Sequence, residues 1–298
     1  MDIMRQAHRS IVLLLLLAFL PAAISAQAQS YTRRSAVRPA IPSVPPYVVF
    51  AGDTIRLDTP ERRERMDREL MTFTNMHTTS LLMLKRSPRY FTMVTPLLKE
   101  EGLPEDLKYL MVIESNLDPK AVSSAGAAGL WQFTKETAKT YKLFVNAEVD
   151  ERYDITKETL AACQYLKSAY VKFGDWMTVA ASYNDGQKRL EDRIAEQGES
   201  CGLDLWLPEE TMRYMYRLLT SKLFLEHPAD FGFEVPPEER YPYIPPRKSV
   251  LVDGPIESLA DFAREHGTNY QRLKAANLWL RDTKLVNKEG KSYIILIP

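Results

Sequence analysis

The chain has 298 residues, enough to bury a sizeable core and to form two domains. Lys plus Arg and Asp plus Glu both number 39, so no net charge favours binding to nucleic acid or to acidic lipid. The four histidines are scattered without the spacing of metal ligands, which argues against a zinc site. We therefore expect no metal and no cofactor.

The N-terminus has the order of a secretory signal peptide. Two arginines precede the apolar run of residues 11–20, and the small residues of AAISAQAQS follow it. This order predicts a signal peptide at residues 1–28, removed after Ala26 or Ala28. The alternative is an uncleaved membrane anchor, but the apolar run is short for a membrane span. We therefore expect an exported, periplasmic protein, with peripheral association with the cell envelope as a further expectation.

Cys163 and Cys201 are the only cysteines, and neither lies near the cleavage site, so we expect no lipid anchor on an N-terminal cysteine. In an oxidising compartment the two could form a disulfide. The alternative is a buried thiol at Cys163 and a separate loop thiol at Cys201. The sequence leaves both open, because it does not place their Cα atoms.

The region after the signal peptide divides into a tether and a helical domain. Residues 29–59 include the proline-containing stretch SVPPYVV, and we expect them to form an extended tether. From Pro60 the apolar spacing becomes helical, and no alternating strand pattern appears between 60 and 230. We therefore predict a mainly α fold, with an all-helical domain at residues 60–234. Its expected helices lie, in chain order, at residues 61–87, 88–102, 104–115, 134–142, 156–174, 175–184 and 208–228.

The C-terminal part predicts a small second unit. Residues 235–247 contain five prolines and are expected to form a semi-rigid linker. Residues 248–298 then show a strand, two short helices and a closing strand, SYIILIP. A βααβ unit of this size is too small to be comfortably stable alone, so we expect it to lean on the helical domain.

Glu114 stands out among the acidic residues. Leu107, Leu110, Met111 and Glu114 are spaced i, i+3, i+4 and i+7, so the carboxyl continues the apolar face of its helix. It also falls in the last turn, where the helix dipole is negative. Both effects raise the pKa of the carboxyl, as a general acid working near neutral pH requires. The alternative is a glutamate that reaches into solvent from a frayed helix end.

The residues after Glu114 favour the first interpretation. Asn116 can adopt a left-handed conformation and Pro119 cannot continue a helix, so the chain should leave the helix at the glutamate. The run ESNLDPKAVSSAGAAGLWQF, residues 114–133, resembles the catalytic motif of the lytic murein transglycosylases with a soluble-transglycosylase domain. The likeness extends over residues 88–233 and includes ASYNDG at 181–186. The most similar subgroup is the D-type membrane-bound murein transglycosylases, whose members often carry LysM modules.

The resemblance implies a lysozyme-like catalytic domain and a set of site residues. Glu114 matches the catalytic acid and base of the family. Ser123 matches a serine that contacts the sugar or its acetamido group, and Gln132 matches a glutamine on the wall of the cleft. Tyr183 matches a tyrosine whose hydroxyl lies close to the catalytic carboxyl, and Asn184 follows it in the same cleft.

Other residues near these motifs have simpler interpretations. Trp131 and Phe133 could stack on sugars, but aromatic residues in such positions more often belong to the core. Several acids could in principle act with Glu114, but their positions suit turns and helix caps better. These acids are Asp118, Asp150, Glu151 and Asp154.

The resemblance implies non-hydrolytic cleavage of peptidoglycan glycan strands. Glu114 would protonate the oxygen between N-acetylmuramic acid and N-acetylglucosamine, and the N-acetyl carbonyl of the substrate would replace the second carboxylate. Glu114 would then deprotonate the 6-hydroxyl, which attacks C1 to give a 1,6-anhydro sugar. Two alternatives remain, namely a hydrolytic muramidase on the same fold and a non-catalytic peptidoglycan-binding protein.

Residues 248–298 resemble a LysM domain that departs from the usual pattern. Gly254-Pro255-Ile256-Glu257 stands where a Gly-Asp-Thr-Leu element is expected after the first strand. Glycan binding and a packing or spacing role are therefore both open for this unit. The GDTI at residues 52–55 is a chance likeness, because no paired helices and closing strand follow it.

Overall fold

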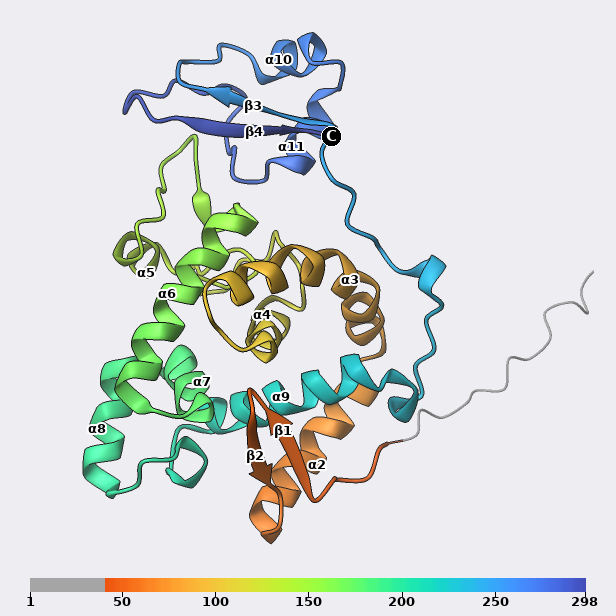
Figure 1. Ribbon diagram of the computed structural model, residues 1–298, viewed down its shortest axis with the longest axis vertical. Coiled ribbons are helices and arrows are strands. Elements are labelled where there is room, and N and C mark those ends of the chain that lie inside the picture. Colours follow the sequence, from red (N-terminus) through yellow and green to blue (C-terminus); the bar gives the residue numbers. More distant parts are fainter. Residues whose placement is uncertain (1–40) are drawn as a thin grey trace, which may run out of the picture. The chain divides into compact units, whose positions relative to one another are not determined.

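The computed structural model describes residues 41–298, and the predicted signal peptide lies outside them. The prediction of a mainly α chain with a small βααβ unit is confirmed (Figure 1). The helices of the first part are α2 (Pro60–Asn75), α3 (His77–Glu100), α4 (Lys108–Ser115), α5 (Lys135–Thr140), α6 (Ile155–Phe173), α7 (Trp176–Asp185), α8 (Gln187–Gln197) and α9 (Glu209–Glu226). The second part comprises β3 (Lys248–Val252), α10 (Leu259–Glu265), α11 (Tyr270–Ala276) and β4 (Tyr293–Ile297).

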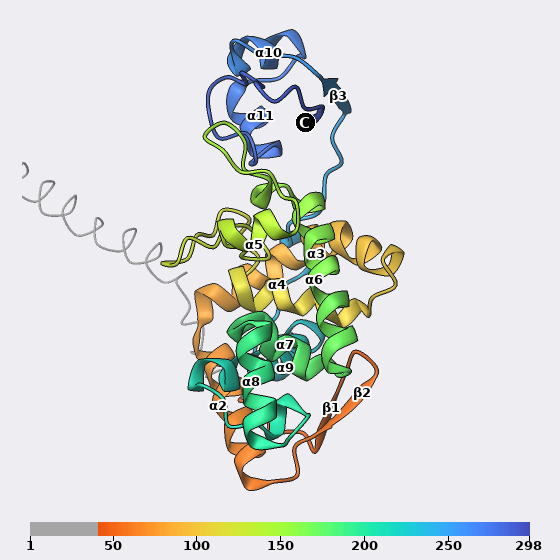
Figure 2. The same cartoon turned by 90° about the vertical axis from the view of Figure 1, so that its left-hand side faces the viewer.

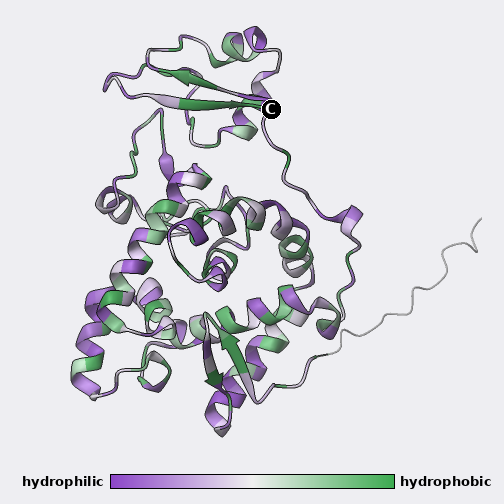
Figure 3. Cartoon of the chain, in the orientation of Figure 1, coloured by the Kyte–Doolittle hydropathy of each residue, from purple (hydrophilic) through white to green (hydrophobic). Residues whose placement is uncertain are grey.

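A β-hairpin replaces the extended tether from Tyr47 onward. The strands β1 (Tyr47–Phe50) and β2 (Asp53–Arg56) pair antiparallel, and the amide of Ala51 at the turn donates to Asp106 Oδ2 at 2.8 Å. Phe50 is fully buried in the main hydrophobic core, and Figure 3 shows β1 as a hydrophobic segment in green. The sequence analysis did not predict the hairpin, because only one face of β1 is buried and four residues form too short an alternating pattern to detect.

The boundary between α2 and α3 differs from the predicted one. The break falls at Met76, whereas the sequence suggested one helix up to Ser87 and a new one from Pro88. Pro88 lies inside α3, where a proline removes the main-chain donor to the carbonyl four residues earlier. The Ser87 hydroxyl donates to that carbonyl, of Leu84, at 3.1 Å, which explains how the helix continues.

Helix α9 is the element around which the helical domain packs. It contacts α2, α4 and α7, and it crosses the lower part of the domain in Figure 1, in cyan. The fully buried Glu69 of α2 accepts from Arg213 of α9 at 2.7 Å, so an ion pair accompanies the apolar contact. The position of α9 decides which of its side chains reach α4.

The βααβ unit has its own apolar cluster. β3 and β4 pair antiparallel with Lys248 opposite Ile297, and Leu259, Leu273 and Ile295 are fully buried between the sheet and the helices. This cluster also includes Val149 of the helical domain, so the unit leans on its neighbour as expected.

The proline-rich segment is anchored to α3. The amide of Tyr241 donates to the carbonyl of Lys85 at 2.7 Å, and Arg89 donates to the carbonyl of Pro242 at 3.2 Å. Within residues 41–298, no helix is both long and apolar enough to cross a membrane.

Replacing Phe50 by alanine should lower the free energy of unfolding by about 3–5 kcal/mol, because a fully buried aromatic side chain leaves a cavity. The matched change Val49→Ala, on the exposed side of the same strand, should change it by less than about 0.5 kcal/mol. Urea unfolding followed by circular dichroism measures both. Equal small effects would mean that the hairpin is not part of the core.

Candidate active site

Glu114 lies in the last turn of α4, and the chain turns away directly after it. Asn116 caps the helix with φ 51°, in the left-handed region. Asp118 then accepts from the amide of Lys120 at 3.0 Å, which is the side-chain turn predicted for this residue. Helix α4 packs against α3 and α9, and Figures 1 and 2 show it flanked by them.

The carboxyl of Glu114 is held by one strong hydrogen bond. The hydroxyl of Tyr214, on α9, donates to Glu114 Oε1 at 2.6 Å. Leu110 and Met111 on the same helix are fully buried, while the Glu114 side chain is partly accessible.

This environment keeps the proton on Glu114 near neutral pH. Burial raises the pKa of Glu114 to about 7, and this effect outweighs the opposing Tyr214 hydrogen bond and the positive charge of Arg217. Burial and the nearby Glu114 charge also raise the pKa of Tyr214, so the tyrosine stays a neutral donor. The predicted direction of the Glu114 shift therefore agrees with the structure, and desolvation is its main cause.

Tyr214 was not among the residues predicted for the site. The sequence suggested that the Tyr183 hydroxyl lies close to Glu114. This hydroxyl donates to the carbonyl of Trp131 at 2.8 Å, and burial followed by the charge of Glu114 raises the pKa of Tyr183. A signal for Tyr214 did exist, because Thr211, Tyr214 and Leu218 share the buried face of α9. A buried tyrosine needs a partner for its hydroxyl, and a neighbouring carboxyl supplies one.

The loop of residues 122–133, here called the small-residue loop, is closed by its own hydrogen bonds. The amide of Ser123 donates to the carbonyl of Ala127 at 2.9 Å, and Ser123 Oγ accepts from the amide of Ala127 at 3.1 Å. Gln132 adopts φ 52°, and its side-chain nitrogen donates to the carbonyls of Ala121 and Gly129 at 3.2 and 2.8 Å. The side-chain nitrogen of Gln132 is therefore used by hydrogen bonds within this region, and only the side-chain oxygen is free for a ligand.

A close approach behind the loop requires a glycine. Gly129 has φ 86°, and a Cβ there would lie 1.8 Å from the carbonyl oxygen of Arg152 and 2.4 Å from Glu158 Oε2. The same Glu158 oxygen accepts from the amide of Trp131 at 3.1 Å. Glu158 is fully buried, and burial raises its pKa well above the usual range. The sequence analysis did not single out Glu158, which lies one turn into α6, because this residue belongs to none of the motifs discussed above.

The remaining predicted residues have structural partners. Trp131 is fully buried, with its indole nitrogen donating to Thr159 Oγ1 at 3.0 Å, and Phe133 is also buried, so both belong to the core. Asn184 at the end of α7 accepts from Thr211 Oγ1 of α9 at 2.8 Å. This bond leaves the Asn184 amide nitrogen to donate to another group.

The other acids that the sequence raised as partners for Glu114 have roles in turns, caps and ion pairs. Each accepts from a main-chain amide, and three of them lie within 4.0 Å of a basic side chain. These acids are Asp118, Asp150, Glu151 and Asp154. Cys163 and Cys201 are both free thiols, so the open question of a disulfide is answered against it.

Comparison with known proteins agrees with this geometry. Residues 95–202 match the family model "Transglycosylase SLT domain", which spans Glu114, the small-residue loop and Tyr183. The chain contains a transglycosylase SLT domain. Residues 248–298 match "Soluble lytic transglycosylase C-terminal LysM-like domain", so the βααβ unit is a LysM-like module. The resemblance seen in the sequence is confirmed for both parts.

Two curated relatives and one solved structure illustrate the likeness. "Membrane-bound lytic murein transglycosylase D" of Escherichia coli K12 is 28% identical over 255 residues, covering 83% of this chain and 54% of that protein. "Peptidoglycan transglycosylase gp16" of phage T7 is 37% identical over 108 residues, covering 36% of this chain and 8% of that protein. The 70 kDa soluble lytic transglycosylase Slt70 of E. coli has a TM-score of 0.38 at 19% identity, covering 52% of this chain and 26% of that structure. The chain spans about half the length of the first of these relatives.

The raised pKa of Glu114 should make stability depend on pH. The folded state holds this proton up to about pH 7, whereas the unfolded chain releases it near the ordinary glutamate pKa of about 4.3. The contribution of the protonated carboxyl is therefore complete below about pH 4 and is lost as the pH rises to about 7. The glutamine of Glu114→Gln stays neutral at every pH. As the pH rises from about 4 to about 7, the free energy of unfolding of this variant should therefore increase by about 3–4 kcal/mol relative to that of the wild type.

Urea unfolding at several pH values measures this difference. The exposed Glu234→Gln serves as the matched control, because it makes the same change at an exposed side chain. A Glu114→Gln stability difference that depends on pH no more than the Glu234→Gln difference would contradict a retained proton on Glu114.

Proposed function

We propose that this protein is a lytic transglycosylase that cleaves peptidoglycan glycan strands, with Glu114 as its one acid and base. The observation that carries the proposal is the Glu114 carboxyl, which has a pKa of about 7 and a hydrogen bond from Tyr214. The SLT domain match around this residue supports the same conclusion. We take residues 60–234 as the catalytic domain, 235–247 as the linker and 248–298 as the LysM-like module.

In the first step, Glu114 gives its proton to the glycosidic oxygen between N-acetylmuramic acid and N-acetylglucosamine. The bond from C1 to that oxygen breaks, and N-acetylglucosamine leaves with a new hydroxyl. The carbonyl oxygen of the N-acetyl group stabilises the positive charge that develops at C1, as in other substrate-assisted reactions. A second enzyme carboxylate is then not needed.

In the second step, the Glu114 carboxylate takes the proton of the 6-hydroxyl of the same muramic acid residue. The oxygen attacks C1, and the 1,6-anhydro ring closes while Glu114 returns to its protonated state. No water enters the product. An intramolecular nucleophile has a high effective concentration, which favours ring closure over attack by solvent. Tyr214 suits both steps, because its hydroxyl can donate to Glu114 as an acid or as a carboxylate.

Two residues of the small-residue loop and two of α7 keep hydrogen-bonding groups that fit an acetylated sugar. The Ser123 hydroxyl can still donate, since only its oxygen is used in the loop, and the Asn184 amide nitrogen can donate as well. The Gln132 side-chain oxygen and the Tyr183 hydroxyl oxygen can accept from sugar hydroxyls or amides. We propose these four residues as the binding groups. Peptidoglycan lies outside the cytoplasm, so this function also fits the predicted export signal at residues 1–28.

Digestion of purified peptidoglycan followed by mass spectrometry tests the reaction. We expect 1,6-anhydro products from the wild type, and a loss of about 10²–10⁴-fold in kcat for Glu114→Gln. Asp118→Asn is the matched control, because asparagine can form the same turn, and it should retain activity. Products one water heavier would indicate a hydrolytic muramidase, and binding without products would indicate a non-catalytic protein.

The pH profile tests the role of the retained proton. Since the acid form of Glu114 starts the reaction, kcat/KM should be high at acidic pH and should fall as the pH rises past about 7. Tyr214→Phe removes a hydrogen bond that favours the carboxylate, so the fall should move to higher pH. An alkaline limb that stays in place in this variant would contradict the assignment of the limb to Glu114.

A further inference from the structure

Within residues 41–298, the hydrogen bonds between the LysM-like module and the catalytic domain come from one segment, residues 144–153, here called the docking arm. The amide of Asp150 donates to the carbonyl of Trp279 at 2.9 Å, and the amide of Arg281 donates to the carbonyl of Glu148 at 2.7 Å. Val149 and Leu280 form an antiparallel bridge between these two bonds. The arm and the module therefore pair as two short strands.

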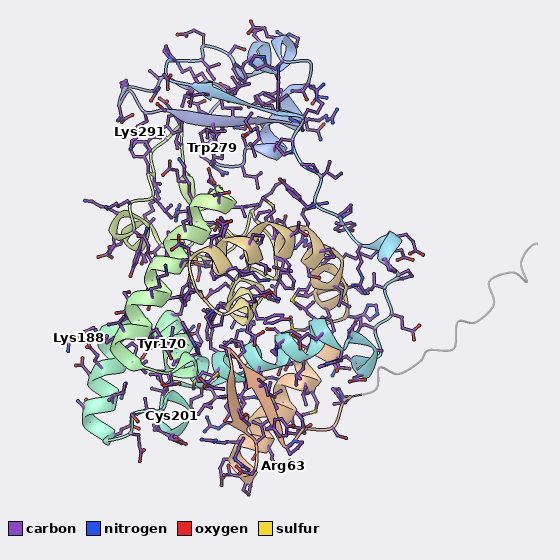
Figure 4. All side chains as sticks on the ribbon, in the orientation of Figure 1. Arg63, Tyr170, Lys188, Cys201, Trp279 and Lys291 are labelled. Carbon is purple, nitrogen blue, oxygen red and sulfur yellow. The ribbon has the colours of Figure 1, made fainter. Side chains whose placement is uncertain are left out.

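Side chains strengthen this junction. Glu148 Oε2 accepts from the amides of Val286 and Asn287 in the module, at 2.7 and 3.3 Å. The Arg281 guanidinium lies 4.2 Å above the ring of Tyr153, and Lys291 lies 4.6 Å above the ring of Phe144. Trp279 and Lys291 are labelled in Figure 4, on the edge of the module that meets the arm.

The docking arm also holds the small-residue loop from behind. Buried Arg152 pairs with the carboxylate of Asp150 through two bonds, at 2.9 and 2.7 Å. The same guanidinium donates to the carbonyls of Gly126 and Phe133, at 2.8 and 3.1 Å. One side chain thus ties together both ends of the segment that carries Gln132.

Apolar packing also links the small-residue loop to the docking arm and the module. Ala128 of the loop is fully buried in the cluster that contains Val149, Tyr153 and the module residue Leu280. The loop therefore has two sides. On one side the carbonyl of Trp131 accepts from Tyr183, and on the other Ala128 packs against the arm and the module.

We propose that the LysM-like module positions the small-residue loop of the active site, acting through Glu148 and Asp150 of the arm and through Arg152. The module fixes the arm, the arm fixes Arg152, and Arg152 fixes the loop, whose Trp131 carbonyl accepts from Tyr183. In this role the module contributes to turnover as well as, or instead of, binding glycan. The effect on turnover rests on the proposed function, whereas the effect on the loop does not.

Two variants in the full-length chain weaken the junction from its two sides. Glu148→Ala removes the acceptor for two module amides, and Leu280→Ala removes packing under the bridge. Leu251→Ser is the control, since Leu251 is exposed on β3, beside a surface hollow lined by residues of α10. In Figures 1 and 2, α10 lies on the side of the module away from the arm.

Hydrogen exchange is the first measurement. The amides of Ala128 and Trp131, which bond to Phe133 O and Glu158, should exchange faster in Glu148→Ala and Leu280→Ala than in the wild type. Exchange in α2 should be the same in all variants, which shows that the domain remains folded. Unchanged loop exchange in both junction variants would overturn the proposal, whatever reaction the protein catalyses.

Kinetics on peptidoglycan is the second measurement. We expect kcat to fall about tenfold in both junction variants with KM within about twofold, because the loop groups lose alignment while the binding groups remain. Leu251→Ser should leave kcat and loop exchange unchanged. A rise in KM with unchanged kcat would mean that the junction serves substrate recruitment, and would also overturn the proposal. An inactive wild type would refute the proposed function alone, since the exchange comparison still decides the positioning role.

Discussion

The site depends on one carboxyl that stays protonated at a partly accessible helix end. Burial opposes ionisation of Glu114, and a single neutral donor, Tyr214, holds the group in place without a compensating charge in direct contact. That donor belongs to α9, which packs against α2, α4 and α7. The ion pair of Arg213 with the buried Glu69 anchors the same turn of α9. The chemistry of Glu114 is thus a consequence of how one long helix is packed.

The small-residue loop is a second constraint, because the polar main-chain atoms of an irregular, partly buried segment need hydrogen-bond partners. Glu158 accepts from the amide of Trp131, Tyr183 donates to the carbonyl of the same residue, and Arg152 binds two further carbonyls. These groups satisfy main-chain atoms that helices and sheets would otherwise satisfy. The absence of a side chain at Gly129 lets Arg152 and Glu158 approach so closely. The LysM-like module extends this support beyond the catalytic domain through the docking arm.

Local signals predicted much of this arrangement. The end of α4 at Asn116, the turn at Asp118 and the cap at Asp154 all follow from side chains that bond to nearby backbone, and the structure has each of them. The hairpin at residues 47–56 and the break at Met76 were predicted wrongly. In the hairpin Phe50 packs into the main core, and the break at Met76 lies between Phe73 and His77, whose rings contact Phe224 and Phe233. The local pattern at both places is too short or ambiguous to show such contacts.

The sequence by itself determined the helical class, the βααβ unit, the place of Glu114 on an apolar helix face and the direction of its pKa shift, because these depend on residue spacing along single elements. Only the tertiary structure decided that Tyr214, 100 residues along the chain, donates to Glu114, and that Tyr183 donates to the carbonyl of Trp131. It also decided that Arg152 links the loop to the arm on which the module docks. Such contacts join segments far apart in the chain, and a side chain's periodicity shows that it is buried without showing which partner it meets.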